Sequence, residues 1–332
     1  MMSYPFTRRA FLGAAATMVG LTALAGCTSA APQPADKSGM VNKPVVVVGT
    51  LPTEDILPLW LVERDGIGLE NSDVSVSVVE FQSATELIAG VGSGEVDMAM
   101  TDIMVAASMF AGGIDVKMEW VTLGTTPDQG RFGIMVGPNS DVKTLQDLAG
   151  VPIGVGTNTI LEYVMDCLME DAGVPADQVV VEELQKLPVR YQAMVSDDVA
   201  AAALPGSLLA LGEASGCHLV ADDSQGRNLS SSVMAVRTDF AEKSPDLVKT
   251  VASAWDAAVA KINANPEEYR ELLVKSANLS DVVAGTYPIS TYPTAQLPTS
   301  DMVEPVLTWM RGKGYLTAAL SYDETTGAFV SQ

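Results

Sequence analysis

The feature that most constrains the fold is a pattern that occurs twice in the chain. A shift of 103 residues places the segment 76–99 on 179–202 without a gap. The identical residues are Val76, Val78, Glu80, Gln82, Ser93, Val96 and Ala99, which fall on Val179, Val181, Glu183, Gln185, Ser196, Val199 and Ala202. Composition alone could give such matches, but the strand, turn and helix signals coincide with them. We therefore expect two halves of like architecture.

The end of the first copy predicts a strand that leads directly into a helix. Apolar residues alternate over 96–100, which is typical of a short strand. Thr101 or Asp102 then follows as the N-cap of the next helix. Ala200 stands at the position equivalent to Asp97, so we expect Asp97 to be structural.

Short apolar, β-branched runs alternate with helical patterns along the rest of the chain. Strands are expected at 45–48, 74–78, 116–123, 133–136, 152–155, 179–181, 199–203 and 233–236. Helices are expected at 141–148, 188–195 and 302–310, around 59–62 and 87–91, and after the start signals at 156–159, 205–207 and 244–246. This alternation predicts an α/β fold with mostly parallel sheets flanked by helices. The strand 133–136 is expected to leave the first half and 233–236 to return to it. The resulting lobes are 44–132 plus 234–332, and 133–233.

Candidate ligand-binding residues follow the strands. In parallel sheets, ligands bind beyond the carboxyl ends of the strands, where helix N-termini expose unpaired N–H groups. The residues expected there are Thr50, Thr53, Gln82, Ser83, Thr101, Asp102, Thr125, Thr157, Asn158, Thr159, Arg190 and Pro205, with Gln185 on the same rim. Ser83, Thr101 and Asp102 could instead simply cap helices. Trp60 is expected in the core, whereas Tyr287 and Tyr292 could reach a cleft or cover the core.

The charges near this rim point in two directions. Helix N-termini favour an anion such as a sulfonate, and Arg131 or Arg190 could pair with it. Glu54, Asp55 and Asp102 favour an amine or a hydrogen-bonding heterocycle. The ligand therefore stays open between a sulfonate, nitrate, a pyrimidine precursor and an amine.

The amino terminus has the pattern of an export signal. A basic stretch at 7–9 precedes an uncharged run of about 17 residues that ends in small residues. The run 7–12 resembles a twin-arginine signal and 24–27 a bacterial lipobox, which implies that residues 1–26 are removed and that Cys27 is lipidated. Residues 27–43 are expected to be a flexible tether.

Composition excludes several classes of partner and site. Without residues 1–26 the chain has 17 basic and 41 acidic side chains, a net charge of −24, which disfavours nucleic acid and anionic lipid headgroups.

Cys167 and Cys217 could form a disulfide, although the apolar helical stripe around Cys167 favours buried thiols. His218 has no partners spaced for a zinc site. No metal is expected.

A dinucleotide fingerprint is also incomplete. Gly154 and Gly156 follow a strand, but Thr159 stands where the third glycine belongs. No cofactor is expected.

Three motifs carry a family resemblance over nearly the whole mature chain. They are Ser-Gly-Glu-Val-Asp at 93–97, the segment 144–155, and Ala-Asn-Pro-Glu-Glu at 264–268. Together they resemble the lipid-anchored substrate-binding proteins of ABC importers, of the nitrate, sulfonate and taurine type, which are related to binders of thiamine pyrimidine precursors. The resemblance implies a type II periplasmic-binding-protein fold whose lobes close on a small solute by hinge motion. It also implies a permease and ATPase as partners, and a location on the outer face of the cytoplasmic membrane.

Two other functions remain as alternatives. Pyrimidine-precursor synthases resemble the same fold, but such chemistry should need clustered histidine and cysteine, which one His and two mature thiols do not supply. We therefore expect no enzymatic activity. A receptor subunit that senses a ligand without transporting it would have the same sequence features.

Overall fold

The computed structural model describes residues 44–317 and 319–331. The predicted signal peptide, the lipidation site at Cys27 and the tether lie outside the described residues.

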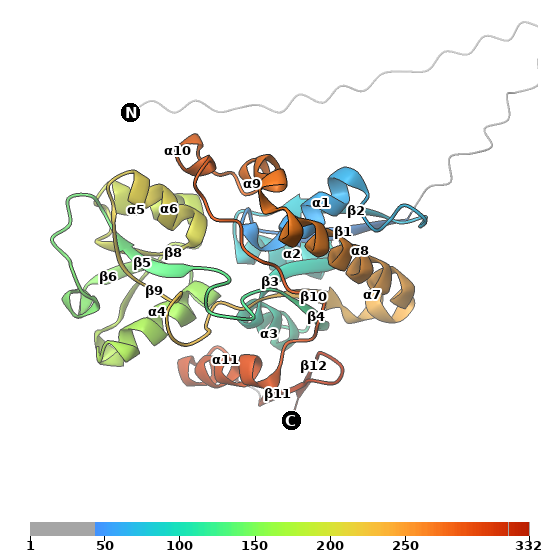
Figure 1. The fold of residues 1–332 in the computed structure, drawn as a ribbon. Helices are drawn as coiled ribbons and strands as arrows, with labels where there is room; N and C mark the ends of the chain where they lie inside the picture. Colours follow the sequence, from blue (N-terminus) through green and yellow to red (C-terminus); the bar gives the residue numbers. More distant parts are fainter. Residues whose placement is uncertain (1–43, 318, 332) are drawn as a thin grey trace, which may run out of the picture. The chain divides into compact units, whose positions relative to one another are not determined.

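The described residues form two β-sheets flanked by helices (Figure 1). Sheet A has the order β11-β12-β4-β10-β3-β1-β2, and sheet B has the order β7-β6-β8-β5-β9. The strands of sheet A are β1 (Val45–Thr50), β2 (Ser75–Glu80), β3 (Met98–Asp102), β4 (Val116–Leu123), β10 (Ser232–Arg237), β11 (Leu320–Asp323) and β12 (Ala328–Ser331). Those of sheet B are β5 (Phe132–Val136), β6 (Pro152–Val155), β7 (Val180–Glu183), β8 (Ala201–Pro205) and β9 (His218–Asp222).

Each sheet combines a parallel core with one strand that arrives from the other half. In sheet A, β1 pairs in parallel with β2 and β3, and β10 runs antiparallel between β3 and β4. In sheet B, β6 pairs in parallel with β7 and β8, and β5 runs antiparallel between β8 and β9. The expected strands at 133–136 and 233–236 lie in β5 and β10, the antiparallel strands of the two sheets. The predicted α/β fold is confirmed.

Helices connect the strands and cover the sheets. The α-helices are α1 (Leu57–Asp65), α2 (Ala84–Ser93), α3 (Ile103–Ala111), α4 (Ile160–Asp171), α5 (Leu187–Val195), α6 (Gly206–Ala214), α7 (Thr238–Lys243), α8 (Pro245–Ala264), α9 (Arg270–Ser276), α10 (Asp281–Ala284) and α11 (Ser300–Lys313). Short 3₁₀ turns are η1 (Glu54–Ile56), η2 (Leu145–Leu148), η3 (Ala176–Gln178) and η4 (Pro266–Tyr269).

The positions of these elements confirm the internal repeat. A shift of 103 residues places β3 on β8 and α3 on α6, residue for residue. It also makes α1 and α2 begin at the first residues of α4 and α5. The repeated unit therefore extends to 57–111 and 160–214, beyond the segment in which identical residues reveal it.

One local prediction was confirmed and another was wrong. The strand expected over 96–100 is present as β3, and all five of its residues are buried because it lies between β1 and β10. The predicted helix 141–148 is reduced to η2, which begins after the N-cap residue Thr144 and contains Asp147, the partner of Thr144 in a capping box.

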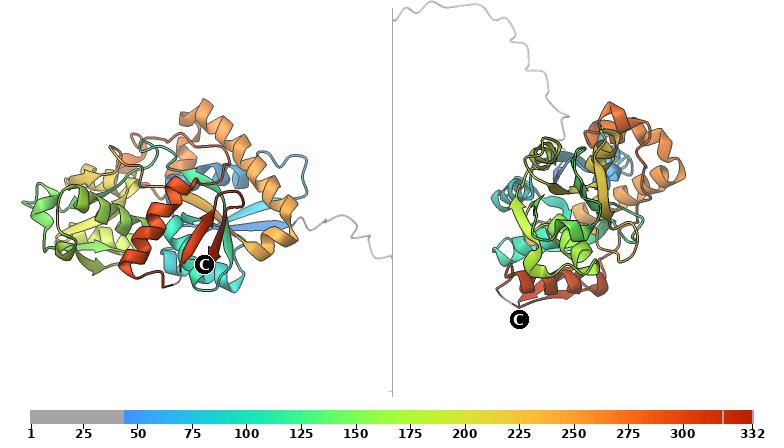
Figure 2. Two further views of the ribbon diagram at one scale, coloured as in Figure 1. Left: turned by 90° about the horizontal axis from the view of Figure 1, so that it is seen from below. Right: turned by 90° about the vertical axis from the view of Figure 1, so that its left-hand side faces the viewer.

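The two sheets share apolar packing on one side of the molecule. Trp60 is buried in a cluster under sheet A, as expected. A second cluster joins residues of α3 and α4 with those of α11, and Figure 2 shows α11, in red, lying between the two halves. Trp309 of α11 packs edge-on against Tyr163 of α4 and donates a hydrogen bond to Asp166 at 2.9 Å.

Two chain segments connect the sheets, 124–131 and 223–231, and they are bonded to each other. Asn228 and Ser231 both donate side-chain hydrogen bonds to the carbonyl of Gly124, at 2.8 and 3.0 Å. Gly124 has φ +82°, and a Cβ there would lie 2.0 Å from the carbonyl oxygen of Ser230. Only glycine allows this approach.

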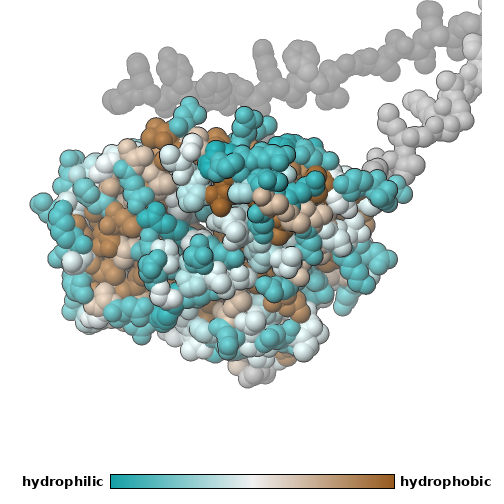
Figure 3. Space-filling model, viewed as in Figure 1, coloured by the Kyte–Doolittle hydropathy of each residue, from teal (hydrophilic) through white to brown (hydrophobic). Residues whose placement is uncertain are grey.

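The face of the molecule in Figure 3 mixes hydrophilic, intermediate and hydrophobic residues. A brown area lies over the half that contains sheet B. No helix in the described part of the chain combines the length and the apolar character that a membrane span requires.

Candidate functional site

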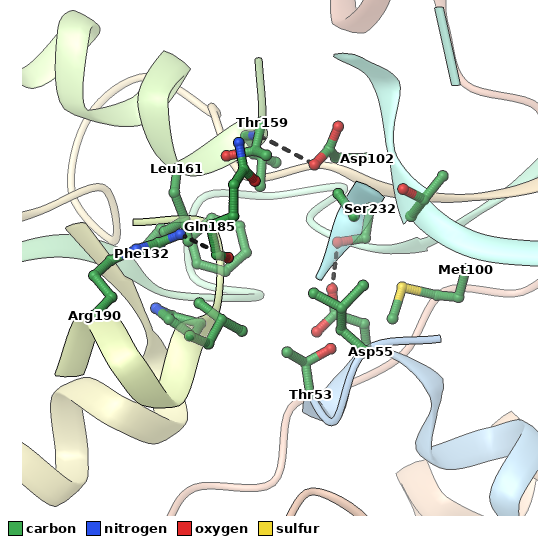
Figure 4. A pocket seen from close by; sticks show the side chains of 16 residues that line it. Thr53, Asp55, Met100, Asp102, Phe132, Thr159, Leu161, Gln185, Arg190 and Ser232 are labelled. Carbon is green, nitrogen blue, oxygen red and sulfur yellow. Dashed lines mark hydrogen bonds between the residues drawn. The ribbon is translucent and has the colours of Figure 1, made fainter. Parts of the chain in front are cut away.

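A cavity lies between the two sheets and takes its walls from both (Figure 4). Its volume is about 80 Å³, measured as the space open to the centre of a water molecule. By the same measure, a site for one water has roughly 10–15 Å³. The space therefore suits a small solute. Its lining residues are Leu51, Thr53, Asp55, Ala84, Met100, Thr101, Asp102, Phe132, Thr159, Ile160, Leu161, Gln185, Leu187, Arg190, Pro205 and Ser232.

The wall on the side of sheet A carries Asp55, which η1 holds directly after β1. Asp55 is only 5% exposed, and it accepts hydrogen bonds from the hydroxyls of Ser232 and Thr53. Ser232 comes from β10, the strand that returns from the other half. Burial raises the pKa of the Asp55 carboxyl despite these bonds.

Glu54 is a second buried carboxyl next to Asp55. The hydroxyl of Tyr287 donates to Glu54 Oε1 at 2.6 Å, and Tyr292 donates to the Glu54 carbonyl at 2.8 Å. Burial, reinforced by the charge of Asp55, raises the pKa of Glu54 to about 7. The two tyrosines are buried themselves, so Tyr287 holds the carboxyl, Tyr292 holds the main chain of the same residue, and both cover the core.

Asp102 joins the two halves. Its Oδ1 accepts from the Val105 amide at 2.7 Å and caps α3, as the sequence predicts. Its Oδ2 accepts from the amide of Ile160, the first residue of α4, at 3.1 Å. Burial raises the pKa of Asp102 to about 6, although these bonds favour the charged form.

The wall on the side of sheet B carries Arg190, which lies in α5 and is 1% exposed. Its guanidinium donates to the carbonyls of Leu184, Gln185 and Ala203 at 2.8 to 3.3 Å. Burial lowers its pKa to about 10. Gly156 makes room for it, because a Cβ there would lie 2.8 Å from Nη2.

Six of the twelve residues predicted as ligand contacts line the cavity: Thr53, Thr101, Asp102, Thr159, Arg190 and Pro205. Gln185, expected on the same rim, lines it as well. Gln82 lines a neighbouring groove that Pro205 also borders.

The other five predicted residues have structural partners outside the cavity lining. Thr50 is fully buried and donates to the Leu51 carbonyl, and Ser83 caps α2. The Thr125 hydroxyl donates to the side chain of Gln129, and the Thr157 amide to Glu183. Asn158 donates to Ser108 of α3 at 2.6 Å, which links the two halves a second time.

Sequence reasoning missed several lining residues. Asp55 was noted only as one of the acidic residues near the rim, without being predicted as a ligand contact. Phe132 and Ser232 are the first residues of β5 and β10, and no sequence pattern marks them as lining residues. Arg131, expected as a partner for an anion, instead pairs with Asp222 at 2.6 Å and with Glu213 at 2.9 Å, outside the cavity lining. The two acidic partners satisfy its charge there.

Both described cysteines are free and buried, so the expectation of buried thiols is confirmed. Burial raises the pKa of Cys167 to about 11 and also raises that of Cys217. His218 is exposed at the start of β9. Asp97 accepts a hydrogen bond from the Val47 amide at 3.0 Å, in keeping with a structural role.

A pair of α/β halves, joined by two segments and enclosing a cavity, defines the periplasmic-binding-protein fold. The family model described as NMT1/THI5 like matches residues 69–269, more than half of the chain. The chain belongs to this family. Its resemblance to the nitrate, sulfonate and taurine type of substrate-binding protein, drawn from the motifs 93–97, 144–155 and 264–268, is thus confirmed.

Individual relatives include binding proteins and an enzyme. The taurine-binding periplasmic protein of Escherichia coli (strain K12) is 27% identical over 262 residues, which cover 75% of this chain and 79% of that protein. The alkanesulfonate-binding protein SsuA from Xanthomonas axonopodis pv. citri, solved with MOPS, matches with a TM-score of 0.70 at 16% identity, over 82% of this chain and 94% of that one. The desulfurization enzyme DszB matches with a TM-score of 0.61 at 16% identity, over 82% and 93%.

Proposed function

We propose that this chain is the solute-binding component of an ABC importer. It captures a small molecule between its lobes, 44–132 plus 234–332 and 133–233, and presents it to a permease and its ATPase. The observation that carries this proposal is the cavity, which is lined by residues of both sheets. Family membership and the taurine-binding and alkanesulfonate-binding relatives support it.

The mechanism is hinge closure. The solute shifts the equilibrium between open and closed forms by its higher affinity for the closed one. Two interlobe hydrogen bonds, Asp102 with Ile160 and Asn158 with Ser108, support a closed form that the protein itself stabilises in part.

A binding role is favoured over catalysis by the chemistry of the lining. All lining residues fall within the described ranges, and they include neither cysteine nor histidine. Burial raises the pKa of both described thiols, which keeps them protonated and weakly nucleophilic. The alternative of an enzymatic function is supported by the desulfurization enzyme DszB, which has the same fold. A ligand-sensing receptor without transport would use the same cavity.

Differential scanning fluorimetry tests the binding role. The protein is heated with sulfonates, nitrate, pyrimidines and small amines, and we expect one class to raise the melting temperature by mass action. Turnover of a candidate substrate, without a thermal shift from any class, would contradict the proposal.

The location follows from the amino-terminal pattern. We propose an exported protein that is anchored through a lipid on Cys27 to the outer face of the cytoplasmic membrane. Membrane fractionation and mass analysis of Cys27→Ala test this. The variant should lose its membrane association and stay uncleaved before residue 27, whereas fractionation and processing like wild type would exclude lipidation there.

A further inference from the structure

The polar side chains of the cavity differ in what they still offer to a ligand. A carboxylate oxygen accepts more than one hydrogen bond, whereas each N–H or O–H donates only once. The hydrogen bonds that the cavity can make to a ligand therefore depend on which lining donors are already bonded within the protein.

All but one of the hydroxyl and side-chain amide donors of the lining are engaged, the exception being Thr101. Ser232 and Thr53 both donate to Asp55. Thr159 donates its hydroxyl to the Gly156 carbonyl at 2.6 Å. The Gln185 amide donates to the Thr157 carbonyl at 3.3 Å and to a carboxylate oxygen of Glu183. Thr101 contributes a hydroxyl that can either donate or accept.

The cationic group is engaged as well. Three N–H groups of Arg190 donate to main-chain carbonyls, and Nη2 lies against Gly156. These three of its five N–H groups hold the loop at 184–185 and the middle of β8, and the other two N–H groups have no acceptor among the described residues. Arg131 is occupied by Asp222 and Glu213 outside the cavity lining.

Acceptors and negative charge remain on the wall of sheet A. Asp55 and Asp102 both line the cavity. Glu54, the neighbour of Asp55 in the sequence, is 4% exposed, and its Oε2 has no hydrogen-bond partner among the described residues. In the described part of the chain Asp55 accepts from hydroxyl groups and forms no salt bridge. A bound cation would recover the desolvation penalty of this buried carboxyl.

The rest of the lining is apolar. It consists of Leu51, Ala84, Met100, Phe132, Ile160, Leu161, Leu187 and Pro205. The groups that surround a ligand thus combine an acidic end with a hydrocarbon body.

We infer that the cavity selects a small solute whose protonated amine or amidinium group donates hydrogen bonds to Asp55, while an apolar body packs against Phe132 and Leu161. This inference rests on the proposed binding function and adds the ligand class. It differs from the alkanesulfonate that one relative is named for, because a ligand whose only charge is a sulfonate would meet the carboxylates of Asp55 and Asp102. Taurine carries an ammonium group as well as a sulfonate, and only its ammonium end fits this inference.

Matched probes test the inference on the purified full-length protein by isothermal titration calorimetry. Benzylamine and benzamidine carry the cation, phenylmethanesulfonate carries the same body with an anion, and taurine carries both charges on a short chain. We expect the amine or the amidine to bind and the sulfonate not to bind. Tighter binding of phenylmethanesulfonate would overturn the ligand class while leaving the binding function intact.

Two variants assign the effect to Asp55. Asp55→Asn keeps an acceptor for Ser232 but removes the charge, and it should weaken amine binding at least about tenfold. Asp97→Asn makes the same change in sheet A outside the cavity lining and should leave the affinity as in wild type. Unchanged affinity in Asp55→Asn would overturn the inference. If none of the probes binds at millimolar concentration, both the ligand class and the binding function proposed for this cavity fail.

Discussion

The two halves of the molecule have the same order of elements but opposite electrostatic roles. A shift of 103 residues places Glu54 and Asp55 on Thr157 and Asn158, and Asp102 on Pro205. The half built on sheet A thus has three buried carboxylic acids where the other has neutral residues.

The reverse holds at one helix. Arg190 of α5 occupies the position of Leu87 in α2, and Leu87 is fully buried in an apolar cluster. One repeat fills this place with hydrocarbon and the other with a guanidinium that binds main-chain carbonyls. The repeated backbone therefore fixes where a site can form, whereas the residues at equivalent positions decide the charge of that site.

The largest effect should come from making the second half resemble the first. Arg190→Leu would leave the carbonyls of Leu184 and Ala203 without their donors, and we expect a loss of about 2–4 kcal/mol in the free energy of unfolding. Urea denaturation measures this. Arg64 is an exposed arginine that pairs with its neighbour Asp65, and Arg64→Leu should change stability by no more than about 0.5 kcal/mol. Equal losses in both variants would refute the structural role of Arg190.

The next largest effect is expected in the pH dependence of stability, because the first half buries several carboxylic acids. The pKa of Glu54 is about 7 in the folded protein against an ordinary value of 4.5, so the folded state binds more protons between these pH values. Its contribution to stability is therefore greatest below pH 4.5, declines as the pH rises through 7, and is constant above. Each pKa unit corresponds to about 1.4 kcal/mol.

Glu54→Gln should make the decline smaller without abolishing it, because Asp55 and Asp102 also have raised pKa values. Denaturation at pH 5 and pH 8 measures the difference. Tyr287→Phe serves as a companion variant, because the tyrosine hydrogen bond lowers the pKa of Glu54. Its loss should make the decline steeper. A pH profile of Glu54→Gln that parallels wild type would show that this carboxyl is not the source.

The smallest effect is expected at the hydrogen bond from the Ile160 amide to Asp102, which links the halves. Asp102 accepts from both Val105 and Ile160, whereas asparagine offers one oxygen. Asn is as good an N-cap as Asp, so Asp102→Asn should keep the cap of α3 and lose the bond to α4, which costs about 1 kcal/mol. Amide hydrogen exchange should accelerate at Ile160 and not at Val105. Equal acceleration at both amides would contradict this assignment.

Much of the fold could be predicted because its signals are local. Periodicity located most strands and helices, and the repeat supplied the relation between the halves. The edge strand β9 was missed because its five residues are only partly buried and start with the polar His218. The hairpin of β11 and β12 was missed because its strands have four residues each.

The site was less predictable, since its properties depend on contacts between distant residues. Asp55 and Ser232 are 177 residues apart, and no spacing rule connects them. Arg190 was predicted to lie at the site, but its hydrogen bonds to three carbonyls could not be predicted from the sequence. Composition shows that an arginine is present and leaves open whether its donors are available.

The bond network at Gly124 has a mechanical consequence. Its carbonyl accepts from Asn228 and Ser231, so the two connecting segments are fastened to each other side by side. Ser231 directly precedes β10, so the same carbonyl also holds the point at which the returning segment enters sheet A. A side chain at position 124 would therefore disturb both connecting segments at once, because its Cβ would meet the carbonyl of Ser230.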